Sequence, residues 1–390
     1  MHRNVYLLAL SQALFMTAVS LVLTVTALVG LALAEDKSLA TLPLALQFLA
    51  LTASTLPAAL FMRRYGRRAG FLVGATFGAA GAAISTYAIV EADFWMFAAA
   101  GMLFGAANSF AQYYRFAAAE STPAALRGRA ISYVLAGGVA AAVAGPNLAR
   151  LTKDMIDAEP FAGSYAALIL LQLGIAALVG FVHAPAPKAD ATHVPARAFG
   201  AIARQPVFWV AVLAGMIGYA SMSLLMTATP LAMHAHGHEF SDTAWVIEWH
   251  ILGMFAPAFF TGDLIRRFGA LNIILAGGAF TLSGIGINLT GTTMVHFWVA
   301  LALVGVGWNF MYIGATTLLT EAYTPAEAAK AQGVNELFVW GAVSAASLSS
   351  GALQHWWGWG TVNLAVIPIL LLPIAATLWL RTRRREAYAG

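Results

Sequence analysis

Long apolar runs alternate with short polar breaks along the chain. Each run is long enough for a helix to cross a hydrocarbon layer of about 30 Å. The first run is too long for a signal peptide and has no small-residue cleavage site behind it, so we expect it to be retained. The pattern predicts an all-α membrane protein with twelve spans, at residues 5–34, 41–62, 69–90, 94–118, 130–151, 164–184, 206–231, 244–265, 271–291, 295–319, 334–353 and 361–380.

The composition excludes a water-soluble protein. Of the 390 residues, 60% are hydrophobic and 10% are charged, whereas soluble globular chains carry about 25% charged residues. The absence of cysteine removes disulfides, thiolate metal ligands and cysteine nucleophiles. No phosphate-binding glycine loop or Ser-His-carboxylate arrangement stands out, so we expect neither enzymatic chemistry nor a cofactor.

The basic residues predict how the helices are oriented in the membrane. With the N-terminus in the cytoplasm, 17 of the 21 lysines and arginines lie in cytoplasmic breaks or at the two ends, and three lie outside. This excess is the positive-inside pattern, so both termini are predicted to face the cytoplasm of a bacterial inner membrane. The basic charge favours anionic lipid of the inner leaflet and gives no reason to expect nucleic acid.

Three short motifs recur in the same order in the second half of the chain. They lie after the second and eighth spans, after the fourth and tenth spans, and late in the fourth and tenth spans. The pairs are Arg63-Arg64-Tyr65-Gly66 with Arg266-Arg267-Phe268-Gly269, Thr122-Pro123-Ala124 with Thr324-Pro325-Ala326, and Asn108 with Asn309, at offsets of 203, 202 and 201 residues. The repeats predict two homologous six-helix halves, residues 1–184 and 206–390, joined by a cytoplasmic linker at 185–205.

This organisation resembles the major facilitator superfamily over essentially the whole chain. The basic turn after the second span, repeated after the eighth, carries the resemblance, although Arg63 stands where that family usually has an acidic residue. The resemblance implies two halves around a central path, with alternating access to a site near the membrane midplane. We expect the protein to be a monomer.

Methionine and histidine recur at helical spacing in two neighbouring spans. Met222 and Met226 are four residues apart in the seventh span, as are His250 and Met254 in the eighth, so each pair lies on one helix face. Counted from the outer helix ends, the four residues lie about 7 to 16 Å deep. Thioether and imidazole ligands suit copper, so the arrangement predicts a metal site. Packing methionines and a hydrogen-bonded core histidine would give the same spacing.

The outer breaks carry further groups that could collect a cation. A tract after the seventh span holds Met233, His234, His236 and His238, and short histidine-rich tracts often bind metal. A solvated polar loop would have the same composition. Nine carboxylates lie in the outer breaks against three basic residues, which would attract a cation.

The paired motifs resemble the CcoA-type bacterial copper importers. Met222, Met226, His250 and Met254 match that pattern residue by residue. The resemblance implies a secondary-active, alternating-access importer that carries copper across the inner membrane for cytochrome oxidase assembly. Copper would then be the transported substrate, and the membrane lipid the other partner.

Two other readings remain open. A proton-coupled transporter of a small organic solute or drug would use Arg115 and Glu248 for charge and the methionines as an apolar wall. A membrane sensor or assembly factor would bind metal without moving it. Further candidate residues for coupling or for lining the path are Gln12, Met16, Asn309 and Met311.

Overall fold

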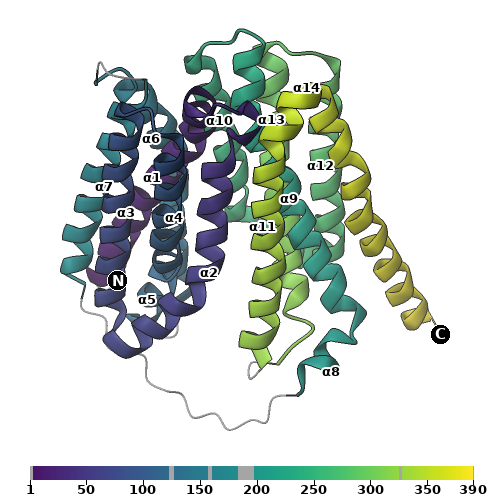
Figure 1. The fold of residues 1–390 in the computed structure, drawn as a ribbon. Coiled ribbons are helices and arrows are strands. Elements are labelled where there is room, and N and C mark those ends of the chain that lie inside the picture. Colours follow the sequence, from purple (N-terminus) through teal and green to yellow (C-terminus); the bar gives the residue numbers. More distant parts are fainter. Residues whose placement is uncertain (1–2, 123–126, 157–159, 183–196, 325–326, 390) are drawn as a thin grey trace. The chain divides into compact units, whose positions relative to one another are not determined.

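The computed structural model describes residues 3–122, 127–156, 160–182, 197–324 and 327–389 (Figure 1). In the first half of the chain the elements are α1 (Arg3–Leu33), the short 3-10 helix η1 (Lys37–Leu39), α2 (Leu42–Tyr65), α3 (Arg67–Val90), α4 (Phe94–Ala111), α5 (Tyr114–Glu120), α6 (Arg127–Thr152) and α7 (Ala162–Gly180). The second half contains α8 (Phe199–Ala203), α9 (Pro206–Ala235), α10 (Phe240–Phe255), α11 (Ala258–Phe268), α12 (Ala270–Thr290), α13 (Met294–Leu319) and α14 (Ala328–Ala389). The prediction of an all-α membrane fold is confirmed.

Four of the predicted spans are divided or joined differently from the prediction. The fourth is divided into α4 and α5, and the eighth into α10 and α11. The second break precedes Pro257, the N-cap of α11, because proline has no backbone N–H to continue the ladder. The eleventh and twelfth spans both lie in α14, where Gly358 has a non-helical backbone (φ 75°, ψ 176°). Across the described residues, nine helical stretches are long and apolar enough to cross a membrane, and the one at residues 330–384 includes this kink.

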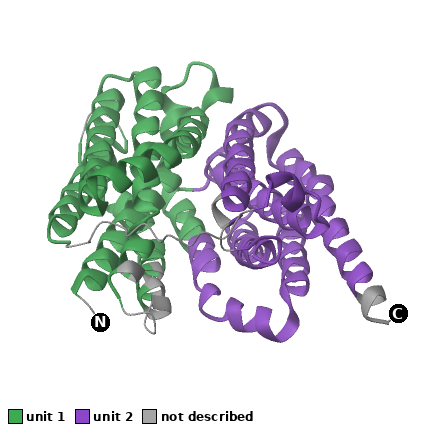
Figure 2. Cartoon of the chain, turned by 90° about the horizontal axis from the view of Figure 1, so that it is seen from below, with its two compact units in different colours: residues 1–189, 239–248 green, residues 190–238, 249–390 purple. Residues whose placement is uncertain are grey.

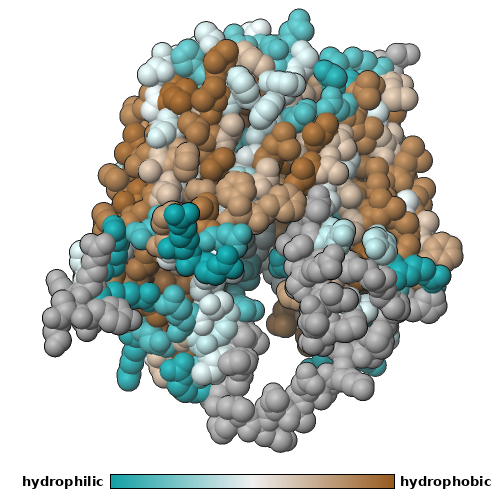
Figure 3. All heavy atoms as spheres, turned by 180° about the vertical axis from the view of Figure 1, so that it is seen from behind, coloured by the Kyte–Doolittle hydropathy of each residue, from teal (hydrophilic) through white to brown (hydrophobic). Residues whose placement is uncertain are grey.

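The chain divides into two compact units (Figure 2). Unit 1 comprises residues 1–189 and 239–248, and unit 2 comprises residues 190–238 and 249–390. On the face drawn in Figure 3, hydrophobic residues gather over the middle of the helices and hydrophilic residues toward their ends. The predicted linker boundaries stay a prediction, because residues 183–196 lie outside the described part of the chain.

The repeated basic turn has the same backbone geometry in both units. Gly66 joins α2 to α3 with φ 89° and ψ 160°, and Gly269 joins α11 to α12 with φ 83° and ψ 150°. Each glycine N–H donates to the carbonyl four residues earlier, at 2.9 Å to Met62 and 2.7 Å to Ile265. Residues other than glycine rarely adopt these backbone angles. The sequence repeat at this turn therefore reflects a backbone requirement.

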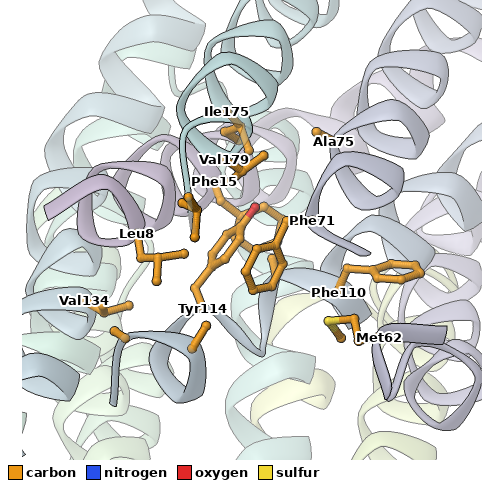
Figure 4. Packing of buried hydrophobic residues seen from close by; sticks show 14 of the residues in the cluster. Leu8, Phe15, Met62, Phe71, Ala75, Phe110, Tyr114, Val134, Ile175 and Val179 are labelled. Carbon is orange, nitrogen blue, oxygen red and sulfur yellow. The ribbon is translucent and has the colours of Figure 1, made fainter. Parts of the chain in front are cut away.

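Aromatic packing holds one end of unit 1 together. The Tyr114 ring lies 4.7 Å from the Phe71 ring and 6.4 Å from the Phe15 ring, which joins α5 to α3 and α1 (Figure 4). All three side chains are almost completely buried. The short α5 is thus fixed by its contacts, since seven residues form no stable helix alone.

Glycines let helices of unit 2 approach closely. A Cβ atom added at Gly277 of α12 would lie 2.7 Å from the Gly307 carbonyl oxygen of α13, and one at Gly284 would lie 2.7 Å from that of Ala300. Both separations are shorter than any real Cβ contact. Small residues at such crossings are typical of membrane helix pairs.

Candidate functional site

The four residues of the predicted metal site are buried in unit 2. Met222 and Met226 lie in α9, and His250 and Met254 in α10. His250 Nδ1 lies 2.7 Å from the Leu301 carbonyl oxygen, so the imidazole is directed at α13. Its Nε2 is buried without a hydrogen-bond partner among the described residues. The histidine thus connects α10 to α13.

Asn309 lies at a junction of three helices. Its Nδ2 donates to the Met254 carbonyl oxygen of α10 at 2.6 Å, and its Oδ1 accepts from Thr261 Oγ1 of α11 at 2.7 Å. The side chain is 1% exposed. Asn309 therefore connects α13 to both helices at the break between α10 and α11.

Met311 is completely buried next to two glycines. A Cβ atom at Gly218 of α9 would lie 3.0 Å from Met311 Cβ, and one at Gly277 of α12 would lie 2.7 Å from Met311 Cγ. The methionine therefore fills the space between α9, α12 and α13.

Two histidines of the tract after α9 bond backbone carbonyls. Met233 is completely buried, whereas His234 and His236 are exposed. His236 Nδ1 lies 2.7 Å from the Ala232 carbonyl oxygen, and His238 Nε2 lies 2.8 Å from that of Thr292. The His238 contact ties this loop to the turn before α13. These four residues thus differ in burial and in partners.

The candidates of unit 1 lie in two places. Gln12 is buried in α1, and the half-buried Met16 packs against the hydrophobic cluster of Figure 4. Arg115 lies in α5 with its Cζ 5.0 Å from the Phe116 ring centroid, and its Nε is buried without a hydrogen-bond partner among the described residues.

Glu248 belongs to a polar chain in unit 1. Asn147 Nδ2 of α6 donates to Glu248 Oε2 at 2.9 Å, and Arg150 Nη2 donates to Asn147 Oδ1 at 2.9 Å. The carboxylate is half-buried. One asparagine therefore lies between a cation and a carboxylate, without direct ion pairing between them.

The sequence analysis missed a cluster of five aromatic rings in unit 2. Ring centroids of Trp308 and Tyr312 are 5.3 Å apart with planes at 10°, a stacked pair on α13. Tyr219 of α9 lies 5.2 Å from Trp308, 5.3 Å from Tyr312 and 5.1 Å from Trp340 of α14. Phe255 of α10 lies 6.1 Å from Trp308. The four-residue spacing of Trp308 and Tyr312 was a signal that could have pointed to a shared helix face.

Polar groups accompany these rings. Trp340 Nε1 donates to Glu336 Oε2 at 2.8 Å, and Asn335 Nδ2 lies 3.3 Å from Glu336 Oε1. Trp308 Nε1 is buried and has no hydrogen-bond partner among the described residues. Tyr219, Tyr312 and Trp340 are only half-buried. The cluster can therefore offer aromatic faces, an indole donor and a carboxylate acceptor to a planar molecule with polar edges.

Comparison with known proteins identifies relatives of the whole chain. The model of the Major Facilitator Superfamily matches residues 8–347. The chain is 42% identical over 389 residues to the riboflavin transporter RfnT of Brucella anthropi, covering 99% of this chain and 98% of that protein. It is 28% identical to the uncharacterized MFS-type transporter YdeG of Bacillus subtilis, covering 98% and 92%. Both relatives are named as transporters.

Solved structures of low sequence identity share the fold. A D-xylose–proton symporter matches with a TM-score of 0.75 at 15% identity, covering 96% of each chain. The nucleoside transporter NupG matches with a TM-score of 0.74 at 15% identity, covering 97% of this chain and 99% of that one.

The prediction of a copper importer, with copper as partner, is wrong. The relative that matches nearly the full length at 42% identity is named for riboflavin. Within the described residues, no group of three or more His, Asp or Glu side chains is placed to hold a metal ion. Helical spacing cannot distinguish ligands from packing residues: His250 Nδ1 faces a backbone carbonyl, and the sulfur side chains of Met222, Met226 and Met254 are buried in the apolar interior. The predicted role of Met233, His234, His236 and His238 at the outer mouth stays a prediction.

Proposed function

This chain belongs to the major facilitator superfamily, and we propose that it carries riboflavin or a closely related flavin across the membrane. The observation that carries the proposal is the 42% identity with a riboflavin transporter over 99% of this chain. This is a specific form of the organic-solute alternative. We also propose that the protein acts as a carrier and not as an enzyme.

The aromatic cluster of unit 2 suits a flavin. Riboflavin has a planar, uncharged three-ring system, carbonyl oxygens and one N–H on its edge, and a chain of hydroxyl groups. Stacking of a planar base on an aromatic side chain contributes about 1–3 kcal/mol. The half-buried rings of Tyr219, Tyr312 and Trp340 are our candidates for that contact.

Two polar groups would orient the solute in this proposal. The Trp308 indole N–H is a buried donor that a flavin carbonyl oxygen could accept from. The Glu336 carboxylate, already held by Trp340, can accept from the ring N–H or from a hydroxyl group. A site that pairs buried polar groups with a solute rejects analogues lacking those groups.

The direct test is growth of a riboflavin-requiring bacterium that expresses this chain. We expect growth at riboflavin concentrations too low for the parent strain, and loss of that growth with Trp340→Ala. Trp356 is the matched control, because it lies in the same helix, α14, and is 62% exposed. Equal growth of wild type and the empty strain would refute the proposal if the protein is present in the membrane.

Proton coupling is a separate part of the proposal. Glu248 is the candidate, because its half-buried carboxylate is held by Asn147 and not by a cation. Replacement by glutamine keeps the hydrogen bond to Asn147 but removes the proton-binding group. If Glu248 couples transport, Glu248→Gln abolishes the response of uptake to an imposed pH gradient while exchange of riboflavin across the membrane continues.

We propose the bacterial inner membrane as the location, with both termini in the cytoplasm. The supporting observation is the distribution of basic residues, 17 of 21 on that side. Reporter fusions at the C-terminus test it: a fluorescent protein that folds in the cytoplasm should be bright, and periplasmic alkaline phosphatase should be inactive.

A further inference from the structure

Unit 2 has a hollow at the end of two membrane-spanning helices. Its volume is about 370 Å³. The apolar part of its lining comes from the start of α9 and the late part of α14: Pro206, Trp209, Val210, Leu213, Ala376 and Trp379. Figure 1 shows α8 and the C-terminal end of α14 at the same end of this unit. The hollow therefore lies where these helices leave the apolar part of the membrane.

One arginine lines this hollow, and a second lies against one of its tryptophans. Arg204, which precedes α9, is part of its lining and is exposed. Arg383 is also exposed, and its Cζ lies 4.7 Å from the Trp379 ring centroid. Arginines at such helix ends can lay their stems along apolar surface and hold the charge at the membrane boundary.

Neighbouring arginines are neutralised, whereas these two are not. Arg384 Nη2 pairs with Glu321 Oε2 at 2.7 Å, and Arg197 Nε pairs with Glu327 Oε1 at 2.6 Å. Over the described ranges, neither Arg204 nor Arg383 forms a salt bridge. The positive charge next to the hollow is therefore available to an anion.

Two tryptophans complete the features of a membrane boundary. Trp209 Nε1 donates to the Ala203 carbonyl oxygen at 2.7 Å, which fixes one indole ring. Trp209 and Trp379 are each 43% exposed. Tryptophan is enriched at the headgroup level of membranes, where one part of the ring is apolar and the other polar.

We propose that this hollow binds one anionic phospholipid from the adjacent leaflet. The phosphate lies at Arg204 and Arg383, and an acyl chain lies along Trp209, Val210 and Leu213. Charge complementarity selects the occupant: an apolar slot with two unpaired cations at its polar end matches a phospholipid with net negative charge better than a zwitterionic one. The proposal is independent of which solute the protein carries.

Native mass spectrometry of the purified full chain tests this proposal. Phosphatidylglycerol and phosphatidylcholine with identical acyl chains are added separately to delipidated protein, and bound lipid is counted. We expect one phosphatidylglycerol to bind at least about tenfold more tightly than phosphatidylcholine, and Arg204→Gln/Arg383→Gln to remove that preference. The matched control is Arg63→Gln/Arg64→Gln, which removes two exposed arginines from unit 1.

A second variant and a competitor sharpen the test. Val210→Trp fills the apolar part of the hollow and should weaken lipid binding without changing charge. Glycerol phosphate has the anionic group without acyl chains and should not compete. Equal preference for the anionic lipid in wild type and Arg204→Gln/Arg383→Gln would overturn the proposal, as would full competition by glycerol phosphate.

Discussion

The Trp308 and Tyr312 rings of α13 lie stacked, with centroids 5.3 Å apart and planes 10° from parallel. Tyr219 contacts both rings from α9. The stack thus joins two helices and leaves the tyrosine rings half-buried. These rings form the proposed contact surface for the flavin.

Removing the Tyr312 ring should weaken riboflavin transport. Tyr312→Leu keeps an apolar side chain but loses stacking, so we expect KM to rise about tenfold at equal protein level. Tyr312→Phe keeps the ring and should change KM less than about threefold. Uptake of labelled riboflavin, normalised to membrane-inserted protein, measures both. Equal KM values for Tyr312→Leu and wild type would exclude Tyr312 from the site.

The repeated turn should depend on glycine in both units. Gly66→Ala and Gly269→Ala place a side chain at φ above 80°, which costs about 1–3 kcal/mol, so both should lower Tm. The control is Gly360→Ala, because Gly360 is exposed in α14 and a Cβ atom there meets nothing within 4 Å. Alanine should be neutral or stabilising at that position. Thermal unfolding in detergent measures these Tm values. An unchanged Tm in both turn variants would show that the turn does not require glycine.

The buried amide of Asn309 should matter for stability. Asn309→Ala removes the side-chain donor to the buried Met254 carbonyl, at about 1–3 kcal/mol, and leaves the Thr261 hydroxyl with the Pro257 carbonyl alone. Asn272→Ala is the control, since Asn272 is exposed and its Nδ2 donates to the Phe268 carbonyl one turn away. We expect a clear loss of Tm for the first variant and almost none for the second. A larger loss of Tm for Asn272→Ala than for Asn309→Ala would show that the Asn309 contacts do not stabilise the fold.

Acidification should weaken the connection between Arg197 and the segment before α14. Hydrogen bonds from the Arg197 side chain and from the Thr324 backbone N–H lower the pKa of Glu327 below its usual value of about 4.5. A lowered pKa means that the ionised carboxylate stabilises the fold fully above about pH 4.5, and that this contribution disappears as pH falls through the folded value.

The measurement is Tm of wild type and Glu327→Gln from pH 8 to pH 3. The difference between them should be constant above about pH 5 and should shrink as the solution becomes more acidic. Glu91→Gln, at an exposed position after α3, controls for general charge removal. A difference that grows on acidification would have the wrong sign for a carboxylate held by these contacts.

Much of the fold was predictable because each long helix coincides with a local apolar run in the sequence. The repeated Arg-Arg-aromatic-Gly motif also pointed to a real feature, the turn at Gly66 and Gly269. The breaks at Pro257 and within the fourth span were missed, since an apolar run continues through a change of helix direction.

The candidate site was less predictable because spacing gives a helix face but not what that face meets. His250 and Met254 share a face with the right period for ligands, yet His250 meets the Leu301 carbonyl of α13. The rings of Tyr219, Trp308 and Trp340 are far apart in sequence and become neighbours only when α9, α13 and α14 pack. Single-helix periodicity contains no information on that contact.

Uptake of radiolabelled riboflavin into proteoliposomes containing the purified protein tests the central claim most directly. The account predicts saturable uptake that unlabelled riboflavin competes away, that Trp340→Ala reduces at least about tenfold, and that Trp356→Ala leaves unchanged. Uptake no faster than in protein-free liposomes, with correctly folded protein, would contradict it.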